Sequence, residues 1–399
     1  MDLELRYARP EEFRKVTDLD GASFGFQYSE QDLEDAKLDL ELDTILVAVD
    51  GERFVGASGE VPFEMTLPGG RIDVTGLSWV SVETTHRRKG ILRALMERQI
   101  REGAERGSGA LILTASEGGI YGRYGFGNAT DTRKVVVDRR GCRLLEPRDQ
   151  HGVTRVSTDE ARDVLRPIYD RWRRMTPGGL DRNEKRWQLQ LLDREHDRNG
   201  MSGLFHLVHD DGYVSYRIKS DWNDGHPRHV VWITDYVVCS PQAHAGLWQV
   251  LIGMDLSATI ESFRIPTADP LPYLLADPRR VRTAELNDGL WVRPLDVAAL
   301  LSARRYAIEI DLALHVVDPV LGDATYRLRG GPGGAACERT DADADLELGV
   351  AEIGALCLGG MRVAPFVQSG RVKCGDAGLV TRVDRAFLAD TAPQCGTFF

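Results

Sequence analysis

Residues Val80–Gly90 read VSVETTHRRKG, and they pass directly into the apolar-faced segment Ile91–Ile100. The valines predict the end of a strand, and the apolar spacing after Gly90 predicts an amphipathic helix. Three cations, Arg87–Lys89, stand where that helix begins, and the helix dipole makes each of them unfavourable there by about 0.3–1 kcal/mol. A bound phosphate group would offset their charge, and Gly90 would let free backbone N–H groups approach it. The stretch therefore predicts a strand, a turn and a helix that together bind an anion.

Elements on both sides extend this unit into one α/β domain. Turn signals and alternating apolar residues predict an antiparallel meander ahead of it, with strands at Leu3–Tyr7, Thr44–Val49, Arg53–Pro62, Glu64–Leu67 and Arg71–Thr75. Helices are expected from Pro10 and over Glu30–Glu41, and the helix after Gly90 is expected to end near Gly103. A strand at Ala110–Thr114 and a short helix within Ile120–Phe126 complete the domain.

Gly21–Gly25 reads GASFG and matches the nucleophile elbow of serine hydrolases. That motif requires a strand before the serine, whereas the pattern from Pro10 predicts a helix. We therefore interpret the segment as a loop lined by Phe24 and Phe26.

A second copy of the unit follows later in the chain. Val238 precedes Gly246 by the same eight residues that separate Val82 from Gly90, and both glycines are predicted to open an apolar-faced helix. The basic turn is missing, because Ala243-His244-Ala245 replaces Arg87–Lys89. The second copy is therefore predicted to be catalytically silent.

Two further regions surround the second copy. Asp138–Gly152 is interpreted as a linker. A third region from Leu290 begins with a helix capped by Asp296 and continues as an α+β module. Its glycine-rich turn, Gly330–Gly334, lacks the Lys and Ser or Thr of a phosphate-binding loop, so it predicts a hairpin connection.

Composition limits the possible partners and location. The chain has 399 residues and a net charge of -11, which argues against nucleic acid as the main partner. The charge suits a cationic substrate, although solubility alone also explains it. Six dispersed cysteines without a C-x-x-C pair predict reduced thiols and no metal site. The chain shows neither a signal peptide at its start nor an apolar run of ~18 residues, so a cytoplasmic location without membrane contact is expected.

The first domain resembles the GCN5-related N-acetyltransferases, or GNAT enzymes. Their signature is carried by Val80-x-Val82 and by Arg87-Arg88-Lys89-Gly90-Ile91-Leu92, with Leu92 larger than the usual small residue. The whole chain is similar to the Eis acetyltransferases, most clearly at Thr85–Met96 and Ala115–Arg123. This resemblance implies an α/β and α+β multidomain protein that assembles as a homohexamer. Its expected parts are an active GNAT domain at residues 1–145, a degenerate GNAT-like domain at 146–290 and a sterol-carrier-like domain at 291–399.

The resemblance also implies which residues bind acetyl-CoA, the expected co-substrate. Val80 and Val82 would hold the pantetheine arm, and the Val82 N–H would contact the oxyanion. Arg87, Arg88 and Gly90 would hold the pyrophosphate, and Ser116 and Gly118 would line the same site. No metal is implied.

Tyr121 matches the general acid of the family, and the carboxylate of Phe399 matches its general base. From the residues alone, Tyr124 competes with Tyr121 for the acid role. A carboxylate with a pKa of about 3.5 is a weak base for an ammonium group, so it either removes a proton or only orients the cation.

Phe24 and Trp79 are the candidate walls of an amine pocket, with ordinary core packing as the alternative. The acidic residue that the family has beside the Phe24 segment is replaced by Gly25 or Phe26, and its penultimate glutamate is Phe398. The predicted substrates are therefore primary amines, either aminoglycoside-like molecules or lysine side chains, with aminoglycosides in question. The competing interpretation is a protein that binds CoA or carries an apolar ligand without catalysis.

Overall fold

The computed structural model describes residues 3–38, 40–146 and 152–399. The chain forms two compact units, and it passes between them more than once. The first unit comprises Met1–Thr130, Leu290–Asp390 and Thr397–Phe399, and the second comprises Asp131–Gly289 and Thr391–Gly396.

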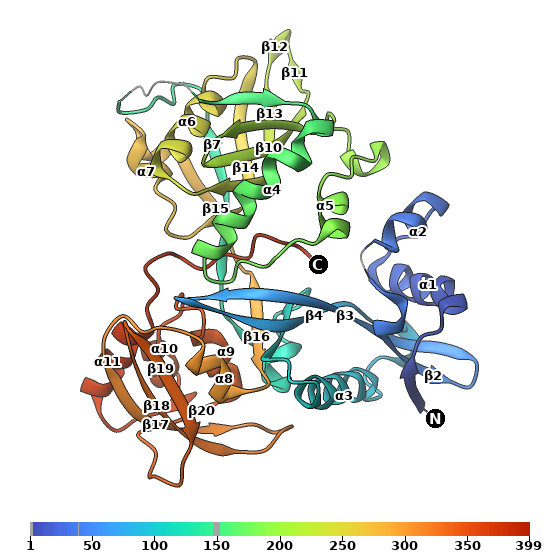
Figure 1. Cartoon of the computed structure of the whole chain (residues 1–399). Coiled ribbons are helices and arrows are strands. Elements are labelled where there is room, and N and C mark those ends of the chain that lie inside the picture. Colours follow the sequence, from blue (N-terminus) through green and yellow to red (C-terminus); the bar gives the residue numbers. More distant parts are fainter. Residues whose placement is uncertain (1–2, 39, 147–151) are drawn as a thin grey trace. The chain divides into compact units, whose positions relative to one another are not determined.

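A seven-stranded sheet forms the centre of the first unit (Figure 1). In spatial order its strands are β1 (Leu3–Tyr7), β2 (Ile45–Asp50), β3 (Arg53–Leu67), β4 (Gly70–Val82), β5 (Ala110–Thr114), β16 (Leu290–Pro294) and β6 (Gly127–Asn128). The strands predicted separately at Glu64–Leu67 and Arg71–Thr75 are parts of β3 and β4. One long hairpin therefore leads into the basic turn.

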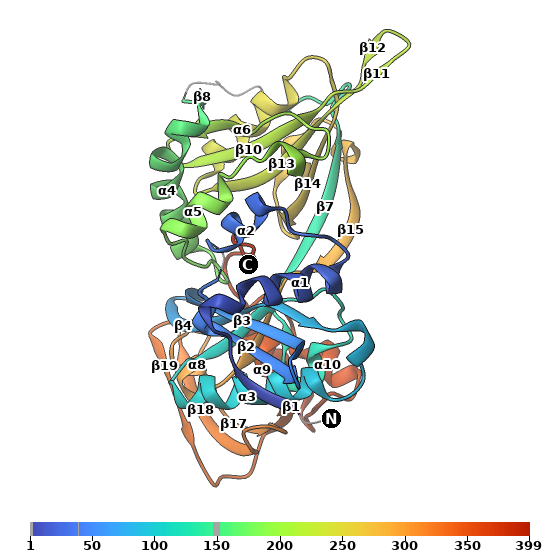
Figure 2. The same ribbon diagram turned by 90° about the vertical axis from the view of Figure 1, so that its right-hand side faces the viewer.

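Helices cover both faces of this sheet (Figure 2). On one face lies α3 (Ile91–Glu105), and its apolar residues Ile91, Leu95 and Met96 are buried in one cluster with Leu77 of β4. The predicted helix after Gly90 is thus confirmed. The other face carries α1 (Phe13–Phe24), which packs on β3 and β4. Because α1 includes Gly21–Phe24, the interpretation of this segment as a loop was wrong, and the serine of GASFG lies within a helix. A helix here still agrees with the absence of a nucleophile elbow. The acidic helix α2 (Glu30–Ala36) ends earlier than the predicted Glu41.

The second unit repeats the topology of the first sheet. Its strands, in spatial order, are β8 (Thr154–Val156), β9 (Phe205–His209), β10 (Gly212–Lys219), β13 (His229–Val238), β14 (Ser257–Pro266), β7 (Asp131–Asp138) and β15 (Val281–Asp288). The pair β10–β13 is antiparallel and β13–β14 is parallel, as β3–β4 and β4–β5 are in the first sheet. The internal repeat predicted from the sequence is therefore confirmed as a repeated fold. Its remaining elements are α4 (Thr158–Met175), α5 (Glu184–Gln190), α7 (Leu271–Leu274), β11 (Trp222–Asn223) and β12 (His226–Pro227).

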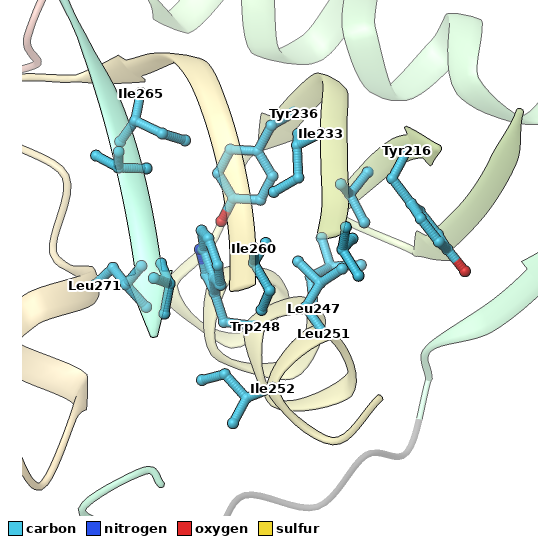
Figure 3. Close-up of a cluster of buried hydrophobic side chains, with 14 of the residues drawn as sticks. Tyr216, Ile233, Tyr236, Leu247, Trp248, Leu251, Ile252, Ile260, Ile265 and Leu271 are labelled. Carbon is cyan, nitrogen blue, oxygen red and sulfur yellow. The ribbon is translucent and has the colours of Figure 1, made fainter. Parts of the chain in front are cut away.

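The helix of the second copy does not begin at Gly246, so that prediction was wrong. Helix α6 spans Pro241–Ile252, with the Ser240 side chain accepting from the Ala243 N–H at 3.2 Å. The His244 N–H donates to the Ser240 carbonyl at 3.1 Å, so this part of the chain is already helical. Figure 3 shows Leu247, Trp248 and Leu251 of this helix among the buried side chains of the second unit. The region that corresponds to the basic turn is thus wound into a helix.

The third region belongs to the first unit and forms a five-stranded sheet with four helices. Its strands are β19 (Gly334–Arg339), β18 (Ala324–Gly331), β17 (Ile310–Val317), β20 (Leu346–Gly349) and β21 (Val372–Lys373). Its helices are α8 (Val297–Ser302), α9 (Val350–Leu356), α10 (Val363–Gln368) and α11 (Ala377–Phe387). Both local predictions are confirmed, because Asp296 caps α8 and Gly331 pairs with Gly334 across a hairpin.

The two sheets exchange strands along the sequence. Strand β7 follows the first domain but pairs with β14 and β15, whereas β16 follows the second domain but pairs with β5 and β6. Within the expected linker, Leu144 is buried and forms a bridge with Leu275, while residues 147–151 lie outside the described residues. The domain boundaries at residues 145, 290 and 291 stay a prediction. Among the described helices, none has the length and apolarity needed to cross a membrane.

Arg182 is the most consequential charged residue of the second unit. Its guanidinium donates to Asp235 at 2.9 Å, lies 3.8 Å from the centre of the Tyr169 ring and donates to the Gly396 carbonyl. Arg182→Met should lower the free energy of unfolding of this unit by ~3–5 kcal/mol, because the Asp235 carboxylate keeps the Tyr213 hydroxyl but loses its charged partner. Arg166→Met removes a half-exposed ion pair with Glu184 and should change it by less than ~1 kcal/mol. Equal losses in urea titrations of the two variants would contradict the importance of the buried pair.

Candidate active site

The pairing between β4 and β5 ends at Gly76. Val74, Thr75 and Gly76 pair with Ala110, Leu111 and Ile112, and no further pair joins these strands in the described chain. On its other side β5 continues to pair, with Leu113 and Thr114 opposite β16. The backbone of β4 from Leu77 to Val82 therefore runs without a strand partner on the β5 side. An extended ligand with amide groups can pair there as an added strand.

Trp79 lies at an irregularity in this part of β4. Its φ is 53°, which is rare for a bulky residue, and the register with β3 shifts between Ala57 and Gly59. Such a bulge re-aims the strand that follows it. Val80 and Val82, the predicted pantetheine contacts, are the residues that follow, and both are half-buried.

The basic turn after β4 has the shape of an anion-binding loop. Arg88 and Gly90 have positive φ values of 63° and 86°, and α3 begins immediately afterwards. In a turn with this backbone conformation, the N–H groups point into a common concavity. The free N–H groups at the N-terminus of α3 point into it as well. Arg87–Gly90 are all exposed, and the Arg87 side chain also donates to the Ser23 carbonyl at 3.5 Å. The structure thus places the predicted pyrophosphate residues in one accessible turn.

The candidate acid lies beyond β5, after the exposed turn that contains Ser116 and Gly118. Tyr121 opens a 3-10 helix (Tyr121–Tyr124), is 6% exposed and packs edge-on against Phe126. Burial, together with Tyr124 and Glu117, raises the pKa of Tyr121 to about 12. Burial also raises the pKa of Tyr124, which is equally buried. Both phenols therefore stay protonated at neutral pH, and these properties alone do not separate their roles.

Phe399 reaches the same strand from the far end of the chain. It is 6% exposed, and its ring centre lies 4.9 Å from that of Phe63. A methyl group on Gly76 would lie 2.7 Å from the Phe399 ring. Phe398, in contrast, is 62% exposed. The last residue is therefore held against β4 where the pairing with β5 ends.

The aromatic residues divide into two groups. Trp79 stacks on Phe13 and lies 5.9 Å from Tyr28, whereas Phe24 is 52% exposed. The end of α1 approaches the site through Ser23, whose hydroxyl donates to the Val82 carbonyl at 3.5 Å. Trp79 thus belongs to a partly packed cluster, and the structure does not bring Phe24 into it.

Sequence reasoning missed three residues beside this site. Asp20 is buried one helical turn before Phe24, and Tyr28 donates to its carboxylate at 2.9 Å. Gly76 receives the Phe399 ring. The position of Asp20 on the inner face of α1 was available from helical spacing, but the contact of Gly76 depends on a residue more than 300 positions away.

Three family models match the chain in order. Two acetyltransferase (GNAT) domains match residues 4–129 and 178–294, and a sterol carrier protein domain matches 297–396. The fold and site therefore define a GNAT enzyme, a class that uses acetyl-CoA. The predicted architecture of tandem GNAT domains and a sterol-carrier-like domain is confirmed.

Individual relatives show to which family of GNAT enzymes the chain belongs. The N-acetyltransferase Eis of Mycobacterium tuberculosis is 37% identical over 350 residues, which cover 86% of this chain and 85% of the relative. An uncharacterized N-acetyltransferase of Streptomyces coelicolor is 34% identical, with 86% of each chain covered. The crystal structure of Eis1 from Mycobacterium abscessus covers all of both chains, with a TM-score of 0.87 and 28% identity. The chain belongs to the Eis family of N-acetyltransferases.

Gly90→Ala tests the basic turn. A methyl group at φ 86° imposes about 1–2 kcal/mol of strain, which distorts the concavity and should raise the Kd for CoA about tenfold or more. Gly107→Ala is the matched control, because Gly107 has a φ of 77° and lies in the turn after the C-terminal end of α3, away from the basic turn. It should destabilise the fold similarly and leave the Kd unchanged. Calorimetric titration with CoA measures both, and equal effects on the Kd would exclude a specific role for Gly90.

Proposed function

We propose that this chain transfers the acetyl group of acetyl-CoA to primary amines, through a ternary complex formed at β4. One observation supports this most strongly: after Gly76, β4 has no strand partner on its β5 side, and it leads into an exposed cationic turn. Unpaired backbone suits the amides of pantetheine, and the turn suits a pyrophosphate. A carrier of apolar ligands would need neither.

We assign the donor along β4 in sequence order. The pyrophosphate binds Arg87, Arg88 and the N–H groups around Gly90, and Ser116 and Gly118 line the opposite side. The pantetheine arm then pairs with Val80 and Val82. The thioester carbonyl lies beside Val80 and Val82, next to the Trp79 bulge, where the Val82 N–H supplies the oxyanion contact. The Phe399 ring lies against Gly76, which precedes Val80 in β4.

The acceptor is assigned as a cationic amine. Asp20 places a buried carboxylate beneath Tyr28, and the Tyr28 ring belongs to the cluster of Trp79 and Phe13. A carboxylate among aromatic faces suits an ammonium group. Asp20 thus offers negative charge in a segment where the acidic residue of the family is absent. Aminoglycoside-like amines and lysine side chains share this chemistry.

The chemistry requires a neutral amine and a protonated leaving group. The amine nitrogen attacks the thioester carbon, the C–S bond breaks, and the sulfur takes a proton as the amine loses one. Tyr121, kept protonated by its raised pKa, donates to the sulfur as negative charge develops there. For the Phe399 carboxylate, removing a proton from an ammonium with a pKa near 9 is uphill by about 7 kcal/mol. We infer that it mainly attracts and orients the cation.

The remaining expectations extend the proposal. We propose domains at residues 1–145, 146–290 and 291–399, with the second GNAT-like domain catalytically silent. Assembly as a homohexamer, a cytoplasmic location and independence from metal and nucleic acid stay predictions.

Tyr121→Phe should lower kcat by ~10²-fold or more, because the sulfur loses its donor. The pH profile gives a second check. The acid form of Tyr121 is lost only as the pH rises through about 12. The rate should therefore rise as the amine deprotonates and show no falling limb below about pH 10. Tyr124→Phe is the matched control and should retain most activity. A larger loss in Tyr124→Phe, or a falling limb below about pH 10 that persists in Tyr121→Phe and vanishes in Tyr124→Phe, would reassign the acid.

Release of the CoA thiol over a panel of primary amines tests the function itself. The 399-residue chain should turn over with cationic amines. The same chain extended by a few residues after Phe399 should bind acetyl-CoA and melt normally but lose turnover, because the carboxylate becomes an amide. An extended chain with full activity would remove the carboxylate from the mechanism. CoA binding without turnover on any amine would contradict the enzyme assignment.

A further inference from the structure

Gly76 and Phe63 form a shallow seat on β3 and β4 for the ring of Phe399. A methyl group on Gly76 would lie 2.7 Å from the Phe399 ring and 2.8 Å from the Phe63 ring, so only glycine leaves room for both. The two rings lie 4.9 Å apart with an interplanar angle of 52°. Phe63 pairs with Val74 in the register of β3 and β4, two residues from Gly76 on the same face. We call Phe63 and Gly76 the terminal seat.

The terminal seat lies on the face of the sheet opposite α3. Leu77, the residue after Gly76, is buried with Ile91 and Leu95 of α3, so Gly76 faces the other way. The pairing of β4 with β5 also ends at Gly76. Gly76 precedes Val80 by four residues in β4, with the Trp79 bulge between them. The terminal seat therefore fixes where Phe399 stands relative to the thioester assigned beside Val80.

The contacts of the residues around Phe399 show how the end of the chain is held. Phe398 is 62% exposed, whereas Phe399 is 6% exposed. Upstream, Gln394 and Gly396 bond within the second unit, through the Arg264 carbonyl and the Arg182 guanidinium. Within the first unit, the described ring contact that holds Phe399 is the one with Phe63. When the Phe399 ring lies in the terminal seat, the carboxylate of the same residue lies close to the seat.

We infer that Gly76 is a positioning residue for catalysis: with Phe63 it seats the Phe399 ring and thereby sets the place of the terminal carboxylate. This inference rests on the proposed function of that carboxylate. It assigns to a strand glycine a task that is unrelated to backbone conformation, because Gly76 does not have a positive φ. Its task is to leave space for a side chain.

Gly76→Ala tests the inference by filling the seat. The variant should lower kcat by ~10- to 100-fold through displacement of the carboxylate, with the Kd for acetyl-CoA unchanged. It should also release phenylalanine to carboxypeptidase A faster than the parent chain, in which Phe399 is buried. Gly103→Ala on α3 is the matched control, because its methyl would meet the side-chain ends of Leu295 and Leu111 and not the tail. Gly103→Ala should change neither kcat nor the rate at which carboxypeptidase A releases phenylalanine.

A double variant separates the seat from general crowding. Phe399→Leu removes the ring and keeps the carboxylate, so Gly76→Ala should add little further loss in its presence. Additive losses would overturn the inference, as would unchanged release of phenylalanine from Gly76→Ala. Faster release with unchanged kcat would overturn the positioning role, whereas the chain extended after Phe399 tests the carboxylate itself. If Gly76→Ala does not fold, Phe63→Leu empties the seat and should give the same two changes.

Discussion

The first unit depends on an incomplete sheet. From Leu77 to Val82, β4 has no strand partner on the β5 side, although β5 itself continues to pair with β16. Backbone N–H and C=O groups need partners, so this edge must be completed by water or by a ligand with amides of its own. The bulge at Trp79, the cationic turn and the Phe399 ring all adjoin this strand. The role proposed for each of these features therefore depends on the free β5-side edge of β4.

The second unit shows that the incomplete sheet alone does not make a site. There too, β13 pairs with β14 in parallel only as far as Ile233, five residues before β13 ends. The difference lies in the turn that follows. In the second unit, α6 already starts at Pro241. The backbone groups equivalent to those left open in Arg87–Gly90 therefore form hydrogen bonds within α6. His244 is also buried, where it bonds to Asp269 at 3.1 Å. We therefore expect the same topology to bind an anion only in the first unit, where the helix starts later.

Much of the first site could be predicted from local sequence. The strand, the basic turn and α3 follow from Val80–Gly90 and the apolar spacing after it, because these signals act over a few residues. The predicted start of α6 at Gly246 is wrong because Ser240 and Pro241 form the stronger helix-capping signal. The exchange of β7 and β16, the Phe399–Gly76 contact and the Asp20–Tyr28 bond depend on tertiary pairing. No local pattern in the sequence encodes these partners.

Hydrogen–deuterium exchange with and without CoA tests the central claim most directly. If CoA completes the sheet at β4 and fills the basic turn, the amides of Val80–Leu92 gain protection on binding. Those of Val238–Gly246 in the second unit remain unchanged. Protection confined to the second unit, or binding that leaves Val80–Leu92 as exchangeable as before, would contradict it.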